Sequence, residues 1–301
     1  MAVSSLSGLS KIVWREPDSH DARQIYSLVH SKDYIEKIYR IAESAGPIFL
    51  DPDTYVTNGT IQALNRLAGA VREAIELVSQ RESYLFILGR PPGHHAGIKG
   101  PALGAPTLGF CIFNTAAVIA KMLAESAKVA VLDFDLHHGN GTQEILWNTE
   151  ILHVDIHQDP STIYPGTGFP WQKGANDNLV NILLPPGAGD DIFMDAVNRA
   201  FEKIVEYDPE FLVVSAGFDA YYNDYTVMRI TDRGFHYVGA KIRDMGIPVV
   251  AILEGGYSIG LSKGLPAFFR GLIGEAQSMV DSTSSGDVLW DRYRRLNRVS
   301  P

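Results

Sequence analysis

The sequence of 301 residues contains a single cysteine, Cys111. One thiol excludes an internal disulfide bond and a cysteine-rich zinc site, and it fits a reducing compartment. No stretch approaches the ~18 uncharged apolar residues of a membrane-spanning helix, and the first ten residues lack the charged and then apolar pattern of a secretory signal. We therefore expect a cytoplasmic protein without a membrane partner.

Positive charge is also scarce. Lysine and arginine number 26 against 35 aspartate and glutamate residues, which gives a formal net charge of −9. This balance argues against a nucleic-acid partner bound through broad neutralisation of phosphates. The locally basic residues lie near the C-terminus, where a solvated helix end explains them about as well as a ligand does: Arg292, Arg294, Arg295 and Arg298.

What the sequence does contain is short, β-branched apolar runs that alternate with amphipathic helical patterns. This alternation is typical of a predominantly parallel α/β sheet with helices on both faces. The predicted strands are residues 84–88, 129–133, 151–156, 179–184, 211–215 and 248–253. The predicted helices are residues 59–80, capped by Thr57 or Asn58, and residues 191–205, 232–245 and 261–280. We expect one domain, 1–301, whose last part, about 281–301, is a C-terminal appendage.

Chemically active residues follow four of the predicted strands. In open α/β sheets ligands bind beyond the carboxyl ends of the strands, so these residues form one candidate site. They are a histidine pair, an Asp-x-Asp-x-His run, a lone aspartate and a tyrosine after two glycines: His94 and His95, Asp133 to His137, Asp219, and Tyr257.

The Asp-x-Asp-x-His run is suited to metal binding because a two-residue step in extended chain returns side chains to the same side. One ion could contact Asp135 and His137, with Asp219 arriving from another strand. Two carboxylates and one imidazole leave coordination positions open, as in catalytic zinc sites, although iron(II) also fits such donors. Helix caps or buried ion pairs explain any one of these acids but explain the combination poorly.

The histidine pair is suited to proton transfer near neutral pH. Asp133 and Asn140 are the candidates to fix the tautomers of His94 and His95. The glycines before Tyr257 permit a tight bend, so its hydroxyl can act as a hydrogen-bond donor to a developing oxyanion.

Six motifs together resemble the zinc-dependent histone deacetylase and acetylpolyamine amidohydrolase family, in its class II or bacterial and archaeal branch. They lie within residues 28–260 and read Arg90-Pro-Pro-Gly-His-His-Ala96, Gly109-Phe-Cys-Ile-Phe-Asn114, Asp133-Phe-Asp-Leu-His-His-Gly-Asn-Gly-Thr-Gln143, Tyr164-Pro-Gly-Thr-Gly168, Ser215-Ala-Gly-Phe-Asp219 and Leu253-Glu-Gly-Gly-Tyr257. The resemblance implies the arginase/deacetylase fold and a zinc ion held by Asp135, His137 and Asp219.

The resemblance also implies roles for the remaining polar residues. His95 would be the general base and acid, and His94 its electrostatic companion, supported by Asp133. Tyr257 would polarise the amide carbonyl, and Asn140 stands where many members have an aspartate.

Substrate contacts follow from the same resemblance. Phe110 and Tyr164 match the aromatic walls of the acyl-lysine tunnel, with Gly109 and Gly256 beside them, and Asp53 matches an aspartate at the rim. Members of the family also bind potassium near the zinc loop, which implies a structural potassium site at Asp133 and Asp155.

The sequence departs from the family pattern in two places. It lacks the usual N-terminal strand and the His-Pro-Glu-Arg-like loop with its arginine, and a second subunit could cover an edge or rim exposed in this way. The stretch 221–228 replaces the usual Asp-Pro-Leu-Gly-Gly, and we expect its aromatic residues to narrow the entrance or to favour a bulkier acyl group.

The resulting hypothesis is a deacetylase that removes acetyl or other acyl groups from lysine side chains of proteins or peptides by means of zinc-activated water. An acetylpolyamine deacetylase is the alternative within the enzymes. An inactive module that binds acyl-lysine is the alternative from another class.

Other motifs carry less weight. Gly256 to Gly260 fits the nucleophile elbow of α/β-hydrolases around Ser258, but that fold needs a later histidine and none follows His236. A phosphate loop at residues 139–142 lacks the accompanying glycine pattern. The remaining histidines are expected to be surface, core or structural residues: His20, His30, His138, His153, His157 and His236.

Overall fold

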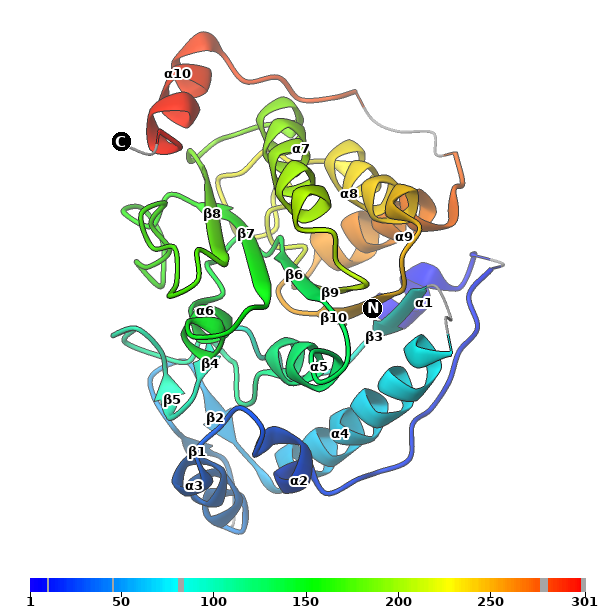
Figure 1. Ribbon diagram of the computed structural model, residues 1–301, viewed down its shortest axis with the longest axis vertical. Helices are drawn as coiled ribbons and strands as arrows, with labels where there is room; N and C mark the ends of the chain where they lie inside the picture. Colours follow the sequence, from blue (N-terminus) through cyan, green and yellow to red (C-terminus); the bar gives the residue numbers. More distant parts are fainter. Residues whose placement is uncertain (10, 45, 81–83, 277–280, 299–301) are drawn as a thin grey trace.

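The computed structural model describes residues 1–301 except 10, 45, 81–83, 277–280 and 299–301. Its centre is a six-stranded parallel sheet with the strand order β3-β10-β9-β6-β7-β8 (Figure 1). The strands are β3 (Tyr84–Ile87), β6 (Val129–Asp133), β7 (Leu152–Gln158), β8 (Leu179–Leu184), β9 (Phe211–Ala216) and β10 (Val249–Leu253). The predicted parallel α/β sheet is therefore confirmed, and each strand differs by at most a few residues at its ends.

Most strand residues are apolar and buried, although β3 at the edge of the sheet is only partly buried and β7 carries buried polar side chains. In β6, Val129 and Val131 face one hydrophobic cluster whereas Ala130 and Leu132 face the other, as the two-residue period of a strand requires. Asp133, the last residue of β6, is in register with Asp155 of β7 and Ser215 of β9. The parallel register brings the segments that follow the strands to one edge of the sheet.

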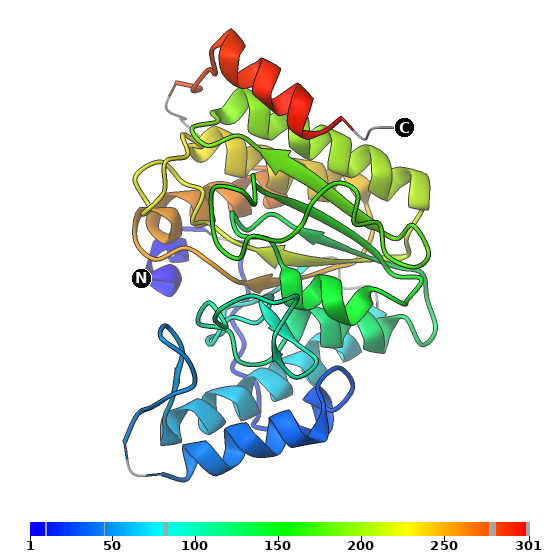
Figure 2. The same ribbon diagram turned by 90° about the vertical axis from the view of Figure 1, so that its left-hand side faces the viewer.

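Helices cover both faces of the sheet (Figures 1 and 2). The face with α7 (Asp190–Tyr207), α8 (Asp232–Met245) and α9 (Leu265–Ile273) is packed with phenylalanines, and the opposite face carries α4 (Asn58–Ser79) and α5 (Thr115–Leu123). The other helices are α1 (Ala2–Leu6), α2 (Ala22–Tyr26), α3 (Lys32–Ala42), α6 (Asn140–Leu146), α10 (Asp287–Leu296) and the π-helix η1 (Gly260–Gly264). Two antiparallel ribbons join β1 (Ile48–Phe49) to β2 (Tyr55–Val56) and β4 (Ala96–Gly97) to β5 (Gly100–Pro101).

The predicted helix ends are correct for α4, α7 and α8 to within two residues. Thr57 is the N-cap of α4, and its backbone N–H donates to Thr60 Oγ1 at 2.9 Å. The prediction of one helix over residues 261–280 is wrong. A π-helix precedes α9, which ends at Ile273 because Gly274 adopts a left-handed conformation with φ of 72°, and residues 277–280 lie outside the described part.

The C-terminal segment packs along the edge of the sheet (Figure 2). The side chain of Asn297 bonds to the backbone N–H and C=O of Leu183 in β8, at 2.8 and 2.9 Å. Tyr293 of α10 is fully buried, and Trp290 donates to Asp191 of α7 at 3.0 Å. These contacts cover edge-strand groups that would otherwise be open to pairing. No described helix is long and apolar enough to span a bilayer.

Candidate active site

The structure brings Asp135, His137 and Asp219 together at the carboxyl edge of the sheet. One donor atom from each lies within 4.8 Å of the others, and His137 Nδ1 lies 2.8 Å from Asp219 Oδ2 and 3.3 Å from Asp135 Oδ1. Asp219 Oδ2 is buried, yet among the described residues it makes no hydrogen bond of acceptable geometry. An orphaned carboxylate oxygen beside a second carboxylate and an imidazole suits a shared divalent cation.

Backbone amides and a glycine fix these carboxylates. Asp135 Oδ2 accepts the N–H of Gly255 at 2.7 Å, and Asp219 Oδ1 accepts the N–H of Leu136 at 3.1 Å. A Cβ at Gly255 would lie 2.4 Å from Asp135 Oδ2 and 2.8 Å from the carboxyl carbon of Asp219. Only glycine at position 255 therefore leaves the two carboxylates in place.

The charge on His137 follows from its neighbours. Burial disfavours the charged imidazole, but the carboxylates of Asp135 and Asp219 outweigh burial and raise the pKa of His137 to about 10. Without a cation, a proton on His137 compensates the negative charges. A metal ion that binds here must displace this proton.

The histidine pair lies beside these three residues, as predicted. The rings of His94 and His95 have centroids 4.0 Å apart. His94 Nδ1 lies 3.0 Å from Asp133 Oδ2, and His95 Nδ1 lies 2.8 Å from the amide oxygen of Asn140. An amide oxygen can only accept a hydrogen bond, so Nδ1 of His95 carries the proton and Nε2 keeps its lone pair.

Two opposite pKa shifts distinguish the pair. Burial and the neighbouring His94 and His137 hold the pKa of His95 well below its usual range. Burial also opposes charge on His94, but Asp133 and Asp135 outweigh it and hold the pKa of His94 well above its usual range. These shifts favour the neutral imidazole of His95, which can accept a proton, and the protonated imidazole of His94.

Aromatic side chains surround the entrance to this site. A cavity of about 530 Å³ is lined by His137 and Asp219 together with the aromatic side chains of Phe110, Tyr225 and Tyr257. The ring centroid of Tyr257 lies 6.0 Å from that of Phe110 and 6.5 Å from that of Tyr225. Burial, Asp219 and Asp135 raise the pKa of Tyr257, so its hydroxyl remains a donor at neutral pH.

The other predicted substrate residues differ in position: Tyr164 and Gly109 lie against His95, whereas Asp53 lies outside the cavity lining. The ring of Tyr164 meets His95 edge-on at 4.9 Å between centroids. Gly109, with φ of 53°, lies between them, and a Cβ there would be 2.6 Å from His95 Cδ2. Asp53 does not line the cavity. It accepts the hydroxyl of Thr54 at 2.6 Å, and Thr54 Oγ1 in turn accepts the N–H of Phe110 at 3.0 Å.

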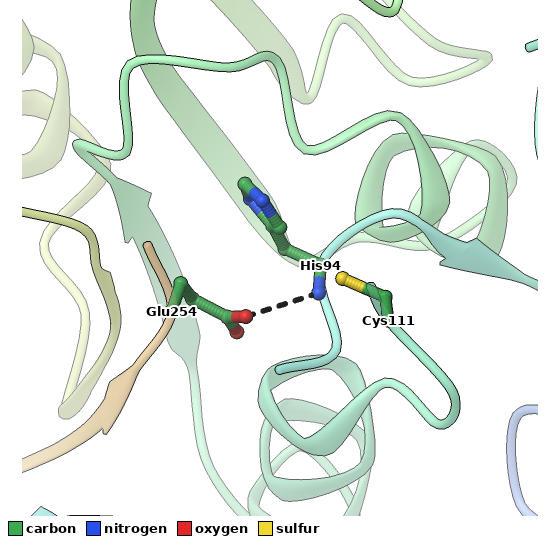
Figure 3. Close-up of side chains that lie close together, drawn as sticks. All are labelled: His94, Cys111 and Glu254. Atoms are coloured by element: carbon green, nitrogen blue, oxygen red, sulfur yellow. Dashed lines mark hydrogen bonds between the residues drawn. The ribbon is translucent and has the colours of Figure 1, made fainter. Parts of the chain in front are cut away.

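Two loops of the site contact each other in a way that the sequence analysis missed. They are the histidine loop, residues 90–96, and the tyrosine loop, residues 254–258 after β10. Arg90 donates to the carbonyls of Glu254 at 2.6 Å and Gly256 at 3.0 Å. In return, Glu254 Oε2 accepts the N–H groups of Gly93 at 2.8 Å and His94 at 3.3 Å. Figure 3 shows that the main-chain nitrogen of His94, not its imidazole, meets this carboxylate. The only signal in the sequence was that Arg90 and Glu254 belong to the two motifs.

A second buried cluster lies behind the histidine pair. Asp133, His153 and Asp155 each offer a donor atom within 4.8 Å of the others. Asp155 Oδ1 lies 2.7 Å from His157 Nδ1, and Asp155 Oδ2 accepts the N–H of Gly139 at 2.8 Å. His153 is buried, as expected for a core residue, but its place beside these two carboxylates was not predicted. Residues 153, 155 and 157 share one side of β7, which the sequence already indicated.

The competing readings find no support in the geometry. The hydroxyl of Ser258 donates to Asp224 at 2.6 Å, and no described histidine is its partner. In the segment 139–142, the N–H groups of Gly139 and Thr142 already donate, the latter to the carbonyl of His94 at 3.1 Å. His30 is buried, with its two ring nitrogens bonded to Gly97 and Asn114, as expected for a core residue.

Comparison with known proteins decides the family. The sequence family described as histone deacetylase domain matches residues 3–272 of this chain. The chain belongs to the histone deacetylase family. It is 41% identical over 268 residues to an uncharacterised protein of Methanocaldococcus jannaschii, covering 87% of this chain and 76% of that protein. It is 35% identical over 263 residues to a probable deacetylase of Archaeoglobus fulgidus, covering 83% and 70%.

The family fold is also shown by a solved structure. The crystal structure of an acetylpolyamine aminohydrolase from Burkholderia pseudomallei matches with a TM-score of 0.78 and 29% identity, over 90% of this chain and 88% of that one. This deacetylase-family chain thus has the fold that its motifs predicted.

Proposed function

We propose that this family member is a zinc-dependent deacetylase that hydrolyses the amide of acyl-lysine side chains in proteins or peptides. The single observation that carries the proposal is the convergence of Asp135, His137 and Asp219, which could hold a metal ion, with a pair of histidine rings beside them and a cavity with aromatic walls that His137 and Asp219 help to line. A module that only binds acyl-lysine has no need of this arrangement.

Asp135, His137 and Asp219 would hold the cation, and their oxygen and nitrogen donors suit zinc. A bound divalent cation supplies Lewis-acid polarisation of a carbonyl and activation of a water molecule at neutral pH. We also propose that the second cluster, with Asp133 and Asp155, holds a structural potassium ion near the loop.

The residues of the chain supply the proton transfers. His95 accepts a proton at Nε2 as water attacks the amide carbon, and Asn140 keeps the tautomer that leaves Nε2 free. Cationic His94 stabilises the developing negative charge, and the hydroxyl of Tyr257 donates to the oxyanion. His95 then returns the proton to the leaving amine, so that a carboxylic acid and a free amine are formed.

The cavity favours acyl-lysine over an acylated polyamine. Of its two acidic lining residues, Asp219 would be taken up by the cation, and Asp224 accepts three donors from Tyr257 and Ser258. The remaining walls are mainly aromatic and aliphatic, which suits the methylene chain of lysine better than further ammonium groups. The likeness to an acetylpolyamine aminohydrolase keeps the polyamine as the second candidate.

A substrate panel tests both candidates. The zinc-loaded protein would be offered fluorogenic acetyl-lysine and longer acyl-lysine peptides beside acetylated spermidine and putrescine, with His95→Ala as the matched inactive control. We expect the highest kcat/KM for an acyl-lysine peptide. A higher value for an acetylpolyamine would reverse the substrate assignment. Binding of acetyl-lysine peptide without turnover would instead support the inactive binding module.

A further inference from the structure

The loop that carries Tyr257 follows β10, and its first residues are held by Arg90, which donates to the carbonyls of Glu254 and Gly256, and by Asp135, which accepts the N–H of Gly255. These contacts end at the residue before Tyr257. Tyr257 is 42% exposed, and Gly256 before it has φ of 108°. The rings near Tyr257 belong to Phe110 and Tyr225, which are 48% and 83% exposed. Ring contacts of this kind do not hold a hydroxyl to the accuracy that catalysis requires.

A buried carboxylate holds the main chain of Tyr257 and of the residue after it. Asp224 is fully buried, and its Oδ2 accepts the backbone N–H of Tyr257 at 2.9 Å. Its Oδ1 accepts the N–H of Ser258 at 2.8 Å and the hydroxyl of Ser258 at 2.6 Å. Hydrogen bonds to an ionised acceptor are shorter and stronger than neutral ones. These three bonds fix the backbone at Tyr257 and Ser258, and thereby the point from which the side chain of Tyr257 extends.

Asp224 is itself tied to the core. Its N–H donates to the carbonyl of Tyr221 at 2.9 Å. The ring of Tyr221 stacks on Phe235 of α8, with 11° between the planes, and its hydroxyl donates to Asp232 at 2.7 Å. A continuous path of contacts therefore runs from α8 through the 221–228 stretch to the tyrosine loop.

We propose that Asp224 is the positioning residue for Tyr257, and this inference rests on the proposed deacetylase function. Asp224 lines the cavity, but both of its carboxylate oxygens are engaged by Tyr257 and Ser258, so it acts through Tyr257. It holds the backbone of Tyr257 and Ser258 so that the hydroxyl of Tyr257 meets the oxyanion. The 221–228 stretch thus has two roles: Asp224 supports Tyr257, and Tyr225 forms part of the cavity wall.

A double-mutant cycle tests this role. A misplacement of about 1 Å can cost on the order of 100-fold in rate, so we expect Asp224→Asn to lower kcat by roughly 10- to 100-fold with little change in KM. Ser258→Ala removes one bond and keeps both N–H contacts, so its loss should be clearly smaller. In a Tyr257→Phe background, Asp224→Asn should lower kcat little further, because no hydroxyl remains to be positioned.

Equal losses in both backgrounds would overturn the proposal, as would a normal kcat for Asp224→Asn. Zinc content and thermal unfolding measured on each variant identify a general structural defect, which would also count against positioning. Absence of turnover by the unchanged protein would instead refute the proposed function. In that case Asp224 would have no catalytic reaction to support.

Discussion

Metal binding by this protein should be strongly coupled to proton release. The pKa of about 10 for His137 means that this imidazole is protonated at neutral pH when no cation is bound. A metal ion needs the neutral imidazole, so each ion bound must release one proton. Since protonation competes at all pH values below this pKa, the zinc association constant should rise about tenfold per pH unit, or about 100-fold from pH 7 to pH 9.

Competition with a chromophoric chelator at several pH values measures this slope. Calorimetry in buffers of different ionisation enthalpy counts the released proton independently. The control is His137→Gln, which binds zinc more weakly but has no imidazole proton to lose, so its slope should be flatter. A pH-independent affinity of the unchanged protein, with no proton released, would refute the electrostatic reading of the cluster.

Three further predictions concern the site. His95→Ala and Tyr257→Phe should each lower kcat by about 100-fold or more with native circular dichroism, and near-normal turnover would remove that residue from the mechanism. Asn140→Asp places a carboxylate beside His95 Nδ1 and should raise the low pKa of His95. The acidic limb of kcat/KM should therefore move to higher pH, and a downward shift would contradict the assignment. Gly255→Ala crowds the metal-ligating carboxylates and should reduce zinc per chain, whereas Gly8→Ala, whose methyl meets no atom within 4 Å, should not.

The sheet and the arrangement of the site could be predicted from the sequence because both depend on short-range patterns. Buried parallel strands appear as apolar β-branched runs, and their carboxyl ends meet at one edge. This rule alone placed His94, Asp135 and Asp219 close together, and the structure agrees. The end of α9 was missed although Gly274 offered a standard stop signal.

The supporting contacts could not be predicted in the same way. Glu254 accepts backbone amides 161 residues away at Gly93, and Arg90 donates to carbonyls of the loop that carries Glu254. Backbone groups are present at every position, so no residue spacing reveals which of them a distant side chain will contact. His153 differs, because its two-residue spacing from Asp155 was visible and was not used.

Because Asp224 holds the tyrosine loop, the exposed residues beside it can be substituted without displacing Tyr257. Asp224 reaches the tyrosine loop with its carboxylate alone, while its neighbours Tyr222 and Tyr225 are 50% and 83% exposed and take no part in those bonds. Tyr225 lines the cavity, so its substitution should change KM and acyl preference more than kcat with the best substrate. An equally large loss of kcat for Tyr225→Ala and for Asp224→Asn would show instead that Tyr225 is also needed to position Tyr257.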